Sequence, residues 1–558
     1  MADKTWAGGT SDDAAVAGNW SPSGVPASND KVEIPDASTT SNDCRLTTAT
    51  SWGTLTIATD GILVGNGQTL TLNGGVNDGG TAADYNYTDA GQTSNVSGSL
   101  DIVMRNLRSS GDRAIITAAA NNIRNLKIDD FTADGGGTGK VYTVQSHITI
   151  SGDLTVEYGE LNTAFSSTSY NLTVTGTTTI GPNSGAEDQA TLTCNASTIS
   201  LGSGYASDNA IIMLQGGTYV GGTGNHTSGA IKQTVANTKF TFTNQTHTIN
   251  AEYPSDDRLF SLTGGKSFNS DGRITLEGNF TSYIQWDTTA GDNGPHNLRL
   301  NDANLHAKLR TPMTIEGDLI IDAGRLNTQY DGTDHKDLTV TGYCDVTGTL
   351  TLNTSTVLVA ALRCNSGAAV TQDATGTLAL ATGSNFGGSE GAAYSLRNLD
   401  GTSDINLGGT TTVTGGSYFE PRTATVYASV LNNIIWNANQ YWVGEIRIGG
   451  TLVVNAAKHM QPYGGSKNVT VDGAVTLNGQ LTAHPNAHSD LDTMTFGSLT
   501  IAGGGAYAAT TGTTTITNKN SSNYIIQIGG LFTHNGGTVY IDTSVTGDKL
   551  LDLIPSSG

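Results

Sequence analysis

The fold of this chain is decided by a block of sequence that occurs three times. The first copy reads GDLTV at 152–156, ELNT at 160–163 and NLTVTG at 171–176. The second reads GDLII at 317–321, RLNT at 325–328 and DLTVTG at 337–342, and a more diverged third reads GTLVV at 450–454, HMQP at 459–462 and NVTVDG at 468–473. Each copy places strand signals about twenty residues apart, which is the length of one coil of a β-solenoid.

The segments upstream of the three copies are also alike. NLKI at 125–128, NLRL at 297–300 and NIIW at 433–436 precede them at broadly similar distances. The copies begin at residues 152, 317 and 450, so unequal insertions separate them. This pattern indicates duplication of a multi-coil unit, and it predicts four parts: a cap with the first coils at 1–124, and repeat blocks at 125–296, 297–431 and 432–558, the last with the C-terminal coils.

The composition favours an all-β fold over a disordered chain. Glycine supplies 72 of 558 residues and proline only 11, and charged residues make up 14%. Aliphatic residues alternate with threonine at 54–57, 69–72, 147–150 and 349–352, so that the aliphatic side chains face a core and threonine faces out. We therefore expect a parallel β-solenoid with coils of about twenty residues, capped ends and ladders of asparagine and threonine between coils.

The charge balance argues against a nucleic-acid partner. Lys and Arg total 27 against 49 Asp and Glu, which gives a net charge of −22 and a pI of about 4.6. Affinity for phosphate backbones depends on clustered Lys and Arg. The most basic short run, Arg105 to Arg108 with Arg113, is interpreted as a solvated or interface edge.

The four cysteines, Cys44, Cys194, Cys344 and Cys364, show no CxxC spacing and predict neither a zinc site nor a disulfide scaffold. Cys344 and Cys364 are about one coil apart, which favours a pair of buried thiols over a disulfide. The sequence after Met1 shows no secretory signal, and no run approaches the length of a membrane span. We expect synthesis in a reducing cytoplasm and no membrane span.

Two segments resemble known proteins. The opening, with TWAGG at 5–9, GNW at 18–20, GVP at 24–26 and NDKVEI at 29–34, resembles the start of many β-helical surface proteins, including autotransporter-type adhesins and bacteriophage structural proteins. Trp6 and Trp20 are suited to cover the end of a solenoid core, and Pro22 and Pro26 stiffen the entry. The segment GGLFTHNGGTV at 529–539 is similar to a repeat of phage and environmental surface proteins.

The resemblance covers both adhesins and phage proteins, and the expected absence of a secretory signal favours the phage class. It implies a non-enzymatic structural protein of a phage virion surface, either capsid decoration or cement, or a fibre or spike subunit. It implies a protein made in the host cytoplasm that docks on a major capsid or tail protein and self-associates, with a trimer among the options, and a host surface glycan is a further candidate partner. A β-helical adhesin, extracellular or on the cell surface, is the first alternative. A polysaccharide-depolymerising tailspike is the second.

Because tailspikes cut glycans with paired carboxylates, two acidic groups are candidates. These are Glu157 with Glu160, and Glu316 with Asp318 and Asp322, the latter group forming a row along one strand face. A solvated outer face has the same pattern, and we favour that structural interpretation. Asp129-Asp130, Ser255-Asp256-Asp257 and the segment from Asp331 to His335 are interpreted as polar turns, not calcium sites.

No catalytic residue, cofactor-binding residue or metal ligand is therefore predicted, and neither His335 nor His459 occupies a repeated ligand position. The aromatic residues are more suggestive than the charged ones. Trp436, Tyr441 and Trp442 precede the third repeat, and Tyr85 and Tyr87 lie in a polar insertion. Such residues anchor protein interfaces or stack on sugars, although core or coil-end packing is the favoured interpretation.

Overall fold

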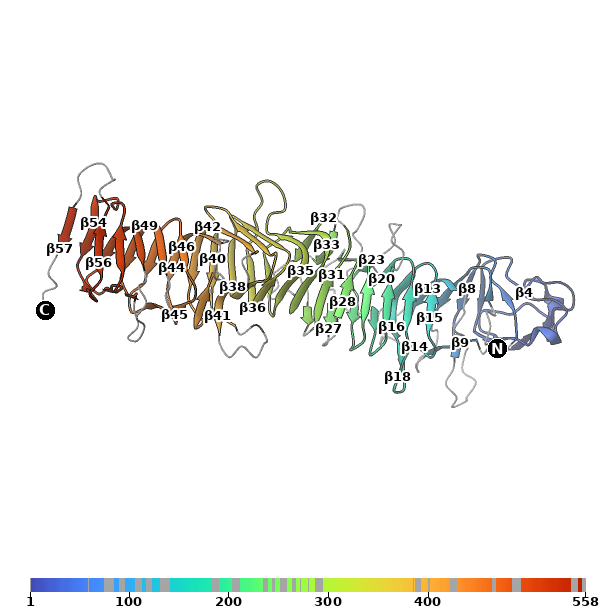
Figure 1. Cartoon of the computed structure of the whole chain (residues 1–558). Helices are drawn as coiled ribbons and strands as arrows, with labels where there is room; N and C mark the ends of the chain where they lie inside the picture. Colours follow the sequence, from blue (N-terminus) through green and yellow to red (C-terminus); the bar gives the residue numbers. More distant parts are fainter. Residues whose placement is uncertain are drawn as a thin grey trace. The chain divides into compact units, whose positions relative to one another are not determined.

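The computed structural model describes most of the chain, and the described residues are 2–58, 60–74, 85–89, 96–105, 113–116, 123–130, 141–182, 190–202, 211–233, 239–242, 246–250, 258–262, 267–270, 272–279, 281–286, 295–384, 386, 393–399, 402–421, 429–463, 468–483, 493–542 and 550–553. The fold is all-β with 59% strand and almost no helix. Parallel coils about 24 residues apart form a β-solenoid of about 17 turns. Figure 1 shows the stacked strands.

The expected all-β solenoid is confirmed, with coils somewhat longer than about twenty residues because each full coil carries three strand positions and their connections. The chain divides into two compact units. Unit 1 comprises Met1–Gly278 and Ile284–Asp292, and unit 2 comprises Asn279–Tyr283 and Asn293–Gly558. The division into four sequence blocks stays a prediction.

The strands of unit 1 form three faces, A, B and C, and the strands within each face run parallel to one another. Face A contains β5 (Thr50–Trp52), β8 (Thr69–Leu72), β11 (Leu100–Met104), β13 (Ile123–Asp129), the first half of β16 (Leu154–Asn162), β20 (Thr178–Ile180), β23 (Ile211–Leu214), β26 (Ala230–Gln233) and β29 (Arg258–Leu262). Face B contains β1 (Asp3–Trp6), β3 (Lys31–Ile34), β6 (Thr54–Ile57), β9 (Tyr85–Asp89), β12 (Arg113–Ile116), β14 (Val141–Val144), the second half of β16, β21 (Ala190–Thr193), β24 (Thr218–Val220), β27 (Lys239–Phe242) and β30 (Ser267–Ser270). Face C contains β4 (Cys44–Arg45), β7 (Leu63–Val64) and β10 (Val96–Ser97) in the first coils, then β15 (Ile148–Ile150), β19 (Leu172–Val174), β22 (Ile199–Leu201), β25 (His226–Ser228), β28 (Thr246–Ile249) and β31 (Arg273–Leu276).

A few elements of unit 1 lie outside this pattern. β2 (Trp20–Ser21) pairs antiparallel with β1, and β17 (Ala164–Phe165) forms a small antiparallel ladder with β18 (Thr168–Ser169). The 3-10 helices η1 (Ala17–Asn19) and η2 (Ala37–Thr39) lie near the amino terminus. β32 (Thr281–Trp286) contributes residues to both units.

Unit 2 has the same plan, with faces D, E and F, and several long strands bend from one face to the next. Face D contains β34 (Met313–Ile315), parts of β36 (Leu338–Val346), β38 (Thr356–Cys364), β42 (Asp404–Val413), β44 (Ser429–Trp436), β49 (Val469–Leu477) and β51 (Met494–Ile501), and β40 (Thr377–Leu380), β47 (Leu452–Val454), β54 (Tyr524–Ile528) and β57 (Leu550–Leu553). Face E contains parts of β33 (Asn297–Leu309), β35 (Leu319–Asn327), β36 and β38, and β41 (Tyr394–Asn398), β43 (Tyr418–Glu420), β45 (Asn439–Trp442), β48 (His459–Pro462), β50 (Gln480–Thr482), β52 (Ala506–Ala508) and β55 (Leu531–Thr533). Face F contains the remaining parts of β33, β35, β42, β44, β49 and β51, and β37 (Thr349–Asn353), β39 (Ala369–Gln372), β46 (Ile446–Ile448), β53 (Thr513–Ile516) and β56 (Thr538–Ile541).

The core forms by the alternation that the sequence predicts. On β19, Leu172 and Val174 are fully buried, whereas Thr173 between them points outward. Outward hydroxyl side chains pair in register along face C, from Thr149 through Thr173, Ser200 and Thr227 to Thr248. This register is the threonine ladder that the sequence predicts. Burial of apolar surface on every coil, which contributes about 25 cal/mol per Å², is the main stabilising term.

An asparagine or aspartate just before a strand, at its first residue or at an irregularity within it joins one coil to the next. The Asp153 N–H donates to Asn125 Oδ1 over 2.7 Å, and the Thr177 N–H donates to Asp153 Oδ1 over 2.8 Å. The same contact recurs elsewhere, with the donor N–H named first: Thr198 to Asn171, Asp318 to Asn297, Tyr343 to Asp318, Thr356 to Asp337, Thr451 to Asn433, and Thr493 to Asn468. We call these acceptors the strand-opening side chains.

A glycine stands where a strand-opening side chain meets the next coil. A Cβ on Gly317 would lie 2.5 Å from both Asn297 Oδ1 and the carbonyl oxygen of His296. A strand-opening carboxamide or carboxylate oxygen crowds the Cβ position in the same way at Gly152, Gly176, Gly342 and Gly450. The repeated glycines thus leave room for the hydrogen bond that ties each coil to its neighbour.

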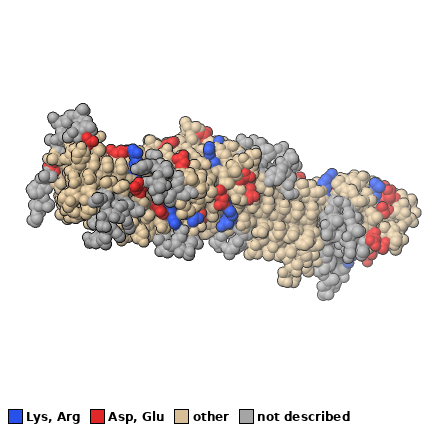
Figure 2. All heavy atoms as spheres, viewed as in Figure 1, with Lys and Arg blue, Asp and Glu red and all other residues tan. Residues whose placement is uncertain are grey.

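The surface carries small groups of charged side chains of both signs, and other residues cover most of the face seen in Figure 2. Among the described residues, no helix is long and apolar enough to cross a membrane.

Candidate functional site

The amino-terminal end of unit 1 is closed by a tryptophan cluster. Trp6, Trp20 and Trp52 are at most 3% exposed and pack edge to face, with ring centroids 5.0 Å apart for Trp6 and Trp20 and 5.7 Å apart for Trp20 and Trp52. The indole N–H groups of Trp6 and Trp20 donate to the carbonyl oxygens of Asn42 and Ala14, both over 2.8 Å. The predicted cap is confirmed, and Trp52 is an additional member.

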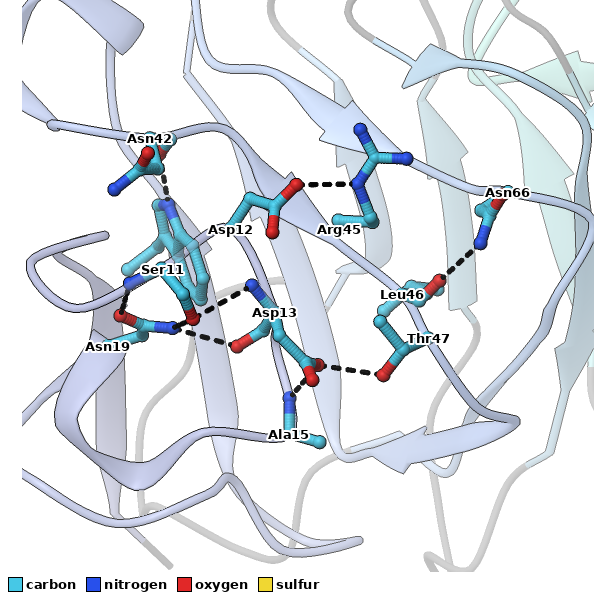
Figure 3. A network of polar contacts seen from close by, with 11 residues as sticks. Ser11, Asp12, Asp13, Ala15, Asn19, Asn42, Arg45, Leu46, Thr47 and Asn66 are labelled. Carbon is cyan, nitrogen blue, oxygen red and sulfur yellow. Dashed lines mark hydrogen bonds and ion pairs between the residues drawn. The ribbon is translucent and has the colours of Figure 1, made fainter.

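A polar network holds the loop around this cap, as Figure 3 shows. Asn19 is fully buried, and its Nδ2 donates to Ser11 Oγ over 2.9 Å and to the Asp13 carbonyl oxygen over 2.8 Å. Arg45 Nε donates to Asp12 Oδ2 over 2.7 Å and so links the loop to β4. These polar groups bond to one another across the cap, which indicates a structural role.

The first candidate carboxylate pair lies on β16, where the strand bends between faces. Glu157 forms an ion pair with Lys127 on the preceding coil. Glu160 Oε1 accepts a hydrogen bond from Asn162 Nδ2 over 2.9 Å on the same strand. Gly159, between the two glutamates, has a φ of 85° and marks the bend, so they belong to different parts of the coil.

The second candidate group does not form a row along one strand face, because β35 begins only at Leu319. Asp318 lies before the strand and is a strand-opening side chain. Asp322 forms an ion pair with Arg299 on the neighbouring coil. Glu316 Oε2 is 3.9 Å from His296 Nδ1. The row that the sequence suggested is therefore wrong in geometry, and these contacts favour the structural interpretation.

Asp322→Asn is expected to lower the free energy of unfolding of unit 2 by less than about 1 kcal/mol, because a half-exposed ion pair contributes little. The measurement is thermal unfolding of this variant beside Asp331→Asn, a change in an exposed turn. Release of reducing sugar from bacterial polysaccharide by the native chain, abolished in Asp322→Asn, would contradict the structural role of this carboxylate.

The remaining polar candidates have ordinary roles where they are described. Asp331 Oδ1 accepts the N–H of Asp334 over 3.1 Å within a turn, as predicted. Asp129, in contrast, is not in an exposed turn: it ends β13, is 8% exposed and accepts from Arg105 Nη2 over 2.8 Å. The segment 255–257, the residues from 106 to 108 and the side chains of Tyr85, Tyr87 and Arg113 lie outside the described part.

Histidine and cysteine residues do not gather into a metal site in the described ranges, where no group of three or more His, Cys, Asp or Glu side chains could hold an ion. His459 Nε2 lies 2.8 Å from Thr482 Oγ1 on the next coil. The backbone of His335 forms an isolated antiparallel bridge with that of Gln329. The four cysteines are free and buried, and burial raises the pKa of the Cys194 thiol to about 12. Cys344 and Cys364 lie on the neighbouring strands β36 and β38, so the prediction of two buried thiols is confirmed.

The interior of unit 1 contains two buried histidines that the sequence did not single out. His226 and His247 are in register on β25 and β28 and are at most 1% exposed. Tyr219 Oη lies 2.7 Å from His226 Nδ1, and Ser228 Oγ lies 2.7 Å from His247 Nε2. Burial lowers the pKa of His226 to about 4, and burial together with the charge of His226 holds the pKa of His247 well below its usual range.

The aromatic candidates before the third repeat separate into core and surface. Trp436 and Trp442 are fully buried, which confirms the favoured core interpretation for both. Tyr441 is 37% exposed and points the other way from its neighbour Trp442, so core packing is wrong for this residue.

Tyr441 belongs to a row of four tyrosines on face E. Tyr394, Tyr418 and Tyr441 are in register on β41, β43 and β45, with ring centroids 5.4 Å and 5.8 Å apart in that order. Tyr463, just after β48, is 51% exposed and places its ring 4.7 Å from that of Tyr418 and 5.7 Å from that of Tyr441. We call these four residues the tyrosine row.

Burial raises the pKa of Tyr418, and its hydrogen bond with Tyr463 raises the pKa further. Within the tyrosine row, Tyr441 and Tyr463 are exposed, and Tyr394 and Tyr418 are partly buried. Comparison with protein-family models, with curated proteins and with solved structures found no match for this chain.

Proposed function

We propose that this chain is a non-enzymatic structural protein of a phage virion surface, acting as capsid decoration or as a fibre or spike subunit. The observation that supports the non-enzymatic role is that the candidate carboxylates for glycan cleavage form hydrogen bonds and ion pairs with neighbouring coils. Asp318 accepts a backbone N–H from the next coil, and Asp322 and Glu157 pair with basic side chains of neighbouring coils. These contacts contribute to a stiff scaffold of stacked coils.

The proposal also draws on the resemblance of residues 5–34 and 529–539 to phage and surface proteins with β-helical repeats. A net charge of −22 suits a large β-protein that must remain soluble until it docks. In this role the protein is made in the host cytoplasm and binds a major capsid or tail protein. The proposal also includes self-association of the chain, with a trimer among the options.

The test is mass spectrometry and electron microscopy of purified particles from the source culture, with the copy number measured relative to the major capsid protein. Hundreds of copies per particle are expected for capsid decoration, and a handful for a tail fibre or spike. The matched control is the same measurement on a lysate from which particles have been removed.

Absence from particles together with recovery in cell-surface fractions would overturn the virion assignment and favour an adhesin. Polysaccharide cleavage by the purified chain would overturn the non-enzymatic assignment and favour a tailspike, whatever the location.

A further inference from the structure

We propose that the tyrosine row of unit 2 is a binding site for a glycan chain that lies along it. This inference concerns the surface of the purified protein and is independent of its assignment to a particle.

The register of the coils produces the row. Phe419 and Trp442 are at most 1% exposed, so the tyrosines that precede them, Tyr418 and Tyr441, point outward. A register shift between Tyr394 and the buried Leu396 keeps Tyr394 in register with Tyr418. One tyrosine therefore appears on each successive coil. The ring centroids are 5.4 Å and 5.8 Å apart, which is close to the length of one pyranose residue in an extended glycan. The rings of Tyr418 and Tyr441 stack at 27° and Arg397 lies over Tyr394, so a glycan along the row would contact mainly the exposed parts of Tyr441 and Tyr463.

The chemistry of tyrosine suits a sugar. Its ring offers an apolar face with a negative quadrupole to the C–H groups of a pyranose, and its hydroxyl group is a hydrogen-bond donor and acceptor. Tyr441 and Tyr463 have the exposed area needed for this contact, at 37% and 51%. The ring of Tyr418 packs against both, with its centroid 5.8 Å from that of Tyr441 and 4.7 Å from that of Tyr463.

Polar groups flank the row. Arg397 places its guanidinium carbon 4.5 Å from the centroid of the Tyr394 ring, and its Nε lies 3.4 Å from Glu420 Oε2. Asn439 is exposed and precedes Tyr441 by two residues on β45, so it points to the same side. A guanidinium, a carboxylate and a carboxamide together offer donors and acceptors to sugar hydroxyl groups.

The area of the row favours an oligosaccharide over a protein partner. With about 200 Å² for a tyrosine side chain, the exposed parts of Tyr441 and Tyr463 amount to on the order of 180 Å², and the partly buried Tyr394 and Tyr418 add less than this. A stable protein interface buries about 800 Å² on each partner. A ligand that is a few sugars long matches the smaller surface.

The test is binding of the full chain to cellohexaose, to chitohexaose and to an array of bacterial surface polysaccharides, with calorimetry for each ligand that binds. Tyr441→Ala and Tyr463→Ala are each expected to weaken binding about tenfold or more, as loss of an aromatic anchor does. Tyr441→Phe keeps the ring and is expected to retain most of the affinity. Tyr540→Ala, at a tyrosine that is 55% exposed on β56, is the matched control and should bind like the native chain.

Absence of binding by the native chain to every glycan would overturn the proposal. Binding that is unchanged in Tyr441→Ala and Tyr463→Ala, or equally weakened in Tyr540→Ala, would overturn it as well. Self-association that both row variants abolish, without glycan binding, would identify the row as a protein interface. Circular dichroism of each variant distinguishes lost binding from lost folding, and none of these results depends on whether the chain occurs in particles.

Discussion

Gly317→Ala is expected to destabilise unit 2 by about 1–3 kcal/mol, the range for overpacking a closely packed site. The added Cβ would lie 2.5 Å from Asn297 Oδ1 and 2.5 Å from the His296 carbonyl oxygen, and neither contact is sterically acceptable. The backbone of the preceding coil must shift to relieve the second contact. That shift would stretch the hydrogen bond from the Asp318 N–H to Asn297 Oδ1, which is 2.9 Å long.

Gly332→Ala is the matched control, because an added Cβ there meets no atom within 4 Å. It is expected to leave stability unchanged or to raise it by a few tenths of a kcal/mol through the unfolded chain. Since long repeat arrays depart from two-state unfolding, the measurement is hydrogen exchange of peptides that cover β33, β35 and β36, supported by thermal unfolding. Faster exchange is expected there in Gly317→Ala and not in Gly332→Ala.

A second substitution identifies the cause. Asn297→Ala alone should cost about 1 kcal/mol, because the Asp318 N–H loses its acceptor. In Gly317→Ala, adding Asn297→Ala removes one of the two close contacts, so the combined cost should be smaller than the sum. Strict additivity, or native exchange in Gly317→Ala, would refute the role assigned to the strand-opening side chains.

The alternation of aliphatic and hydroxyl residues was sufficient to predict the fold. Leu172 and Val174 around Thr173 show why: in a strand, period-two alternation directly decides which side chains face the core. The number of strands in a coil was harder to predict. GDLTV and NLTVTG read as strand signals about twenty residues apart, yet β16 continues from the first of them through ELNT and bends at Gly159, because a positive φ there turns the chain without ending its pairing.

For the strand-opening side chains, the sequence shows only that asparagine or aspartate recurs at these positions. Their function depends on which residue of the next coil lies above each asparagine or aspartate, and coil length varies along the chain. Leu154 pairs with Thr178, whereas Leu338 pairs with Val357, so the offset between coils is not constant. The register must be known before Asn297 can be matched with Gly317.

The tyrosine row was hidden for the same reason, with one additional difficulty. Tyr441 and Trp442 are adjacent aromatic residues, which suggests a shared role, although neighbouring residues in a strand point to opposite faces. The alternation of this short segment separates them into a surface residue and a core residue. Tyr394 and Tyr418 could not have been placed beside Tyr441 without the pairing of β41, β43 and β45.

Acidification from pH 7 to pH 5 is expected to destabilise unit 1 through its buried histidines, with about 2 kcal/mol from His226 alone. The ordinary pKa of histidine, 6.5, applies to the unfolded chain, and burial lowers the pKa of His226 to about 4 in the folded chain. Above pH 6.5 both states are neutral, so the full stability is present. Between pH 6.5 and pH 4 the unfolded chain binds a proton that the folded chain does not, and stability falls as the pH falls.

His226→Gln is expected to remove this part of the pH dependence, because a carboxamide can keep a hydrogen bond with Tyr219 and does not titrate. The measurement is urea unfolding at pH 7, 6 and 5 and constant ionic strength, with hydrogen exchange of peptides that cover β24, β25 and β28. His534→Gln changes a histidine in an exposed segment after β55 and serves as the control.

Equal losses of stability in the native chain and in His226→Gln would contradict this account. Burial opposes but hydrogen bonds from Ala27 and Ala2 lower the pKa of Asp30 below its ordinary 3.8, so this carboxylate of unit 1 is not the source of a loss in this window. His247 has its pKa lowered in the same direction, so His226→Gln should leave a residual dependence. A residual confined to β25 and β28 would locate the remaining proton uptake at His247, since these two strands hold both histidines in register.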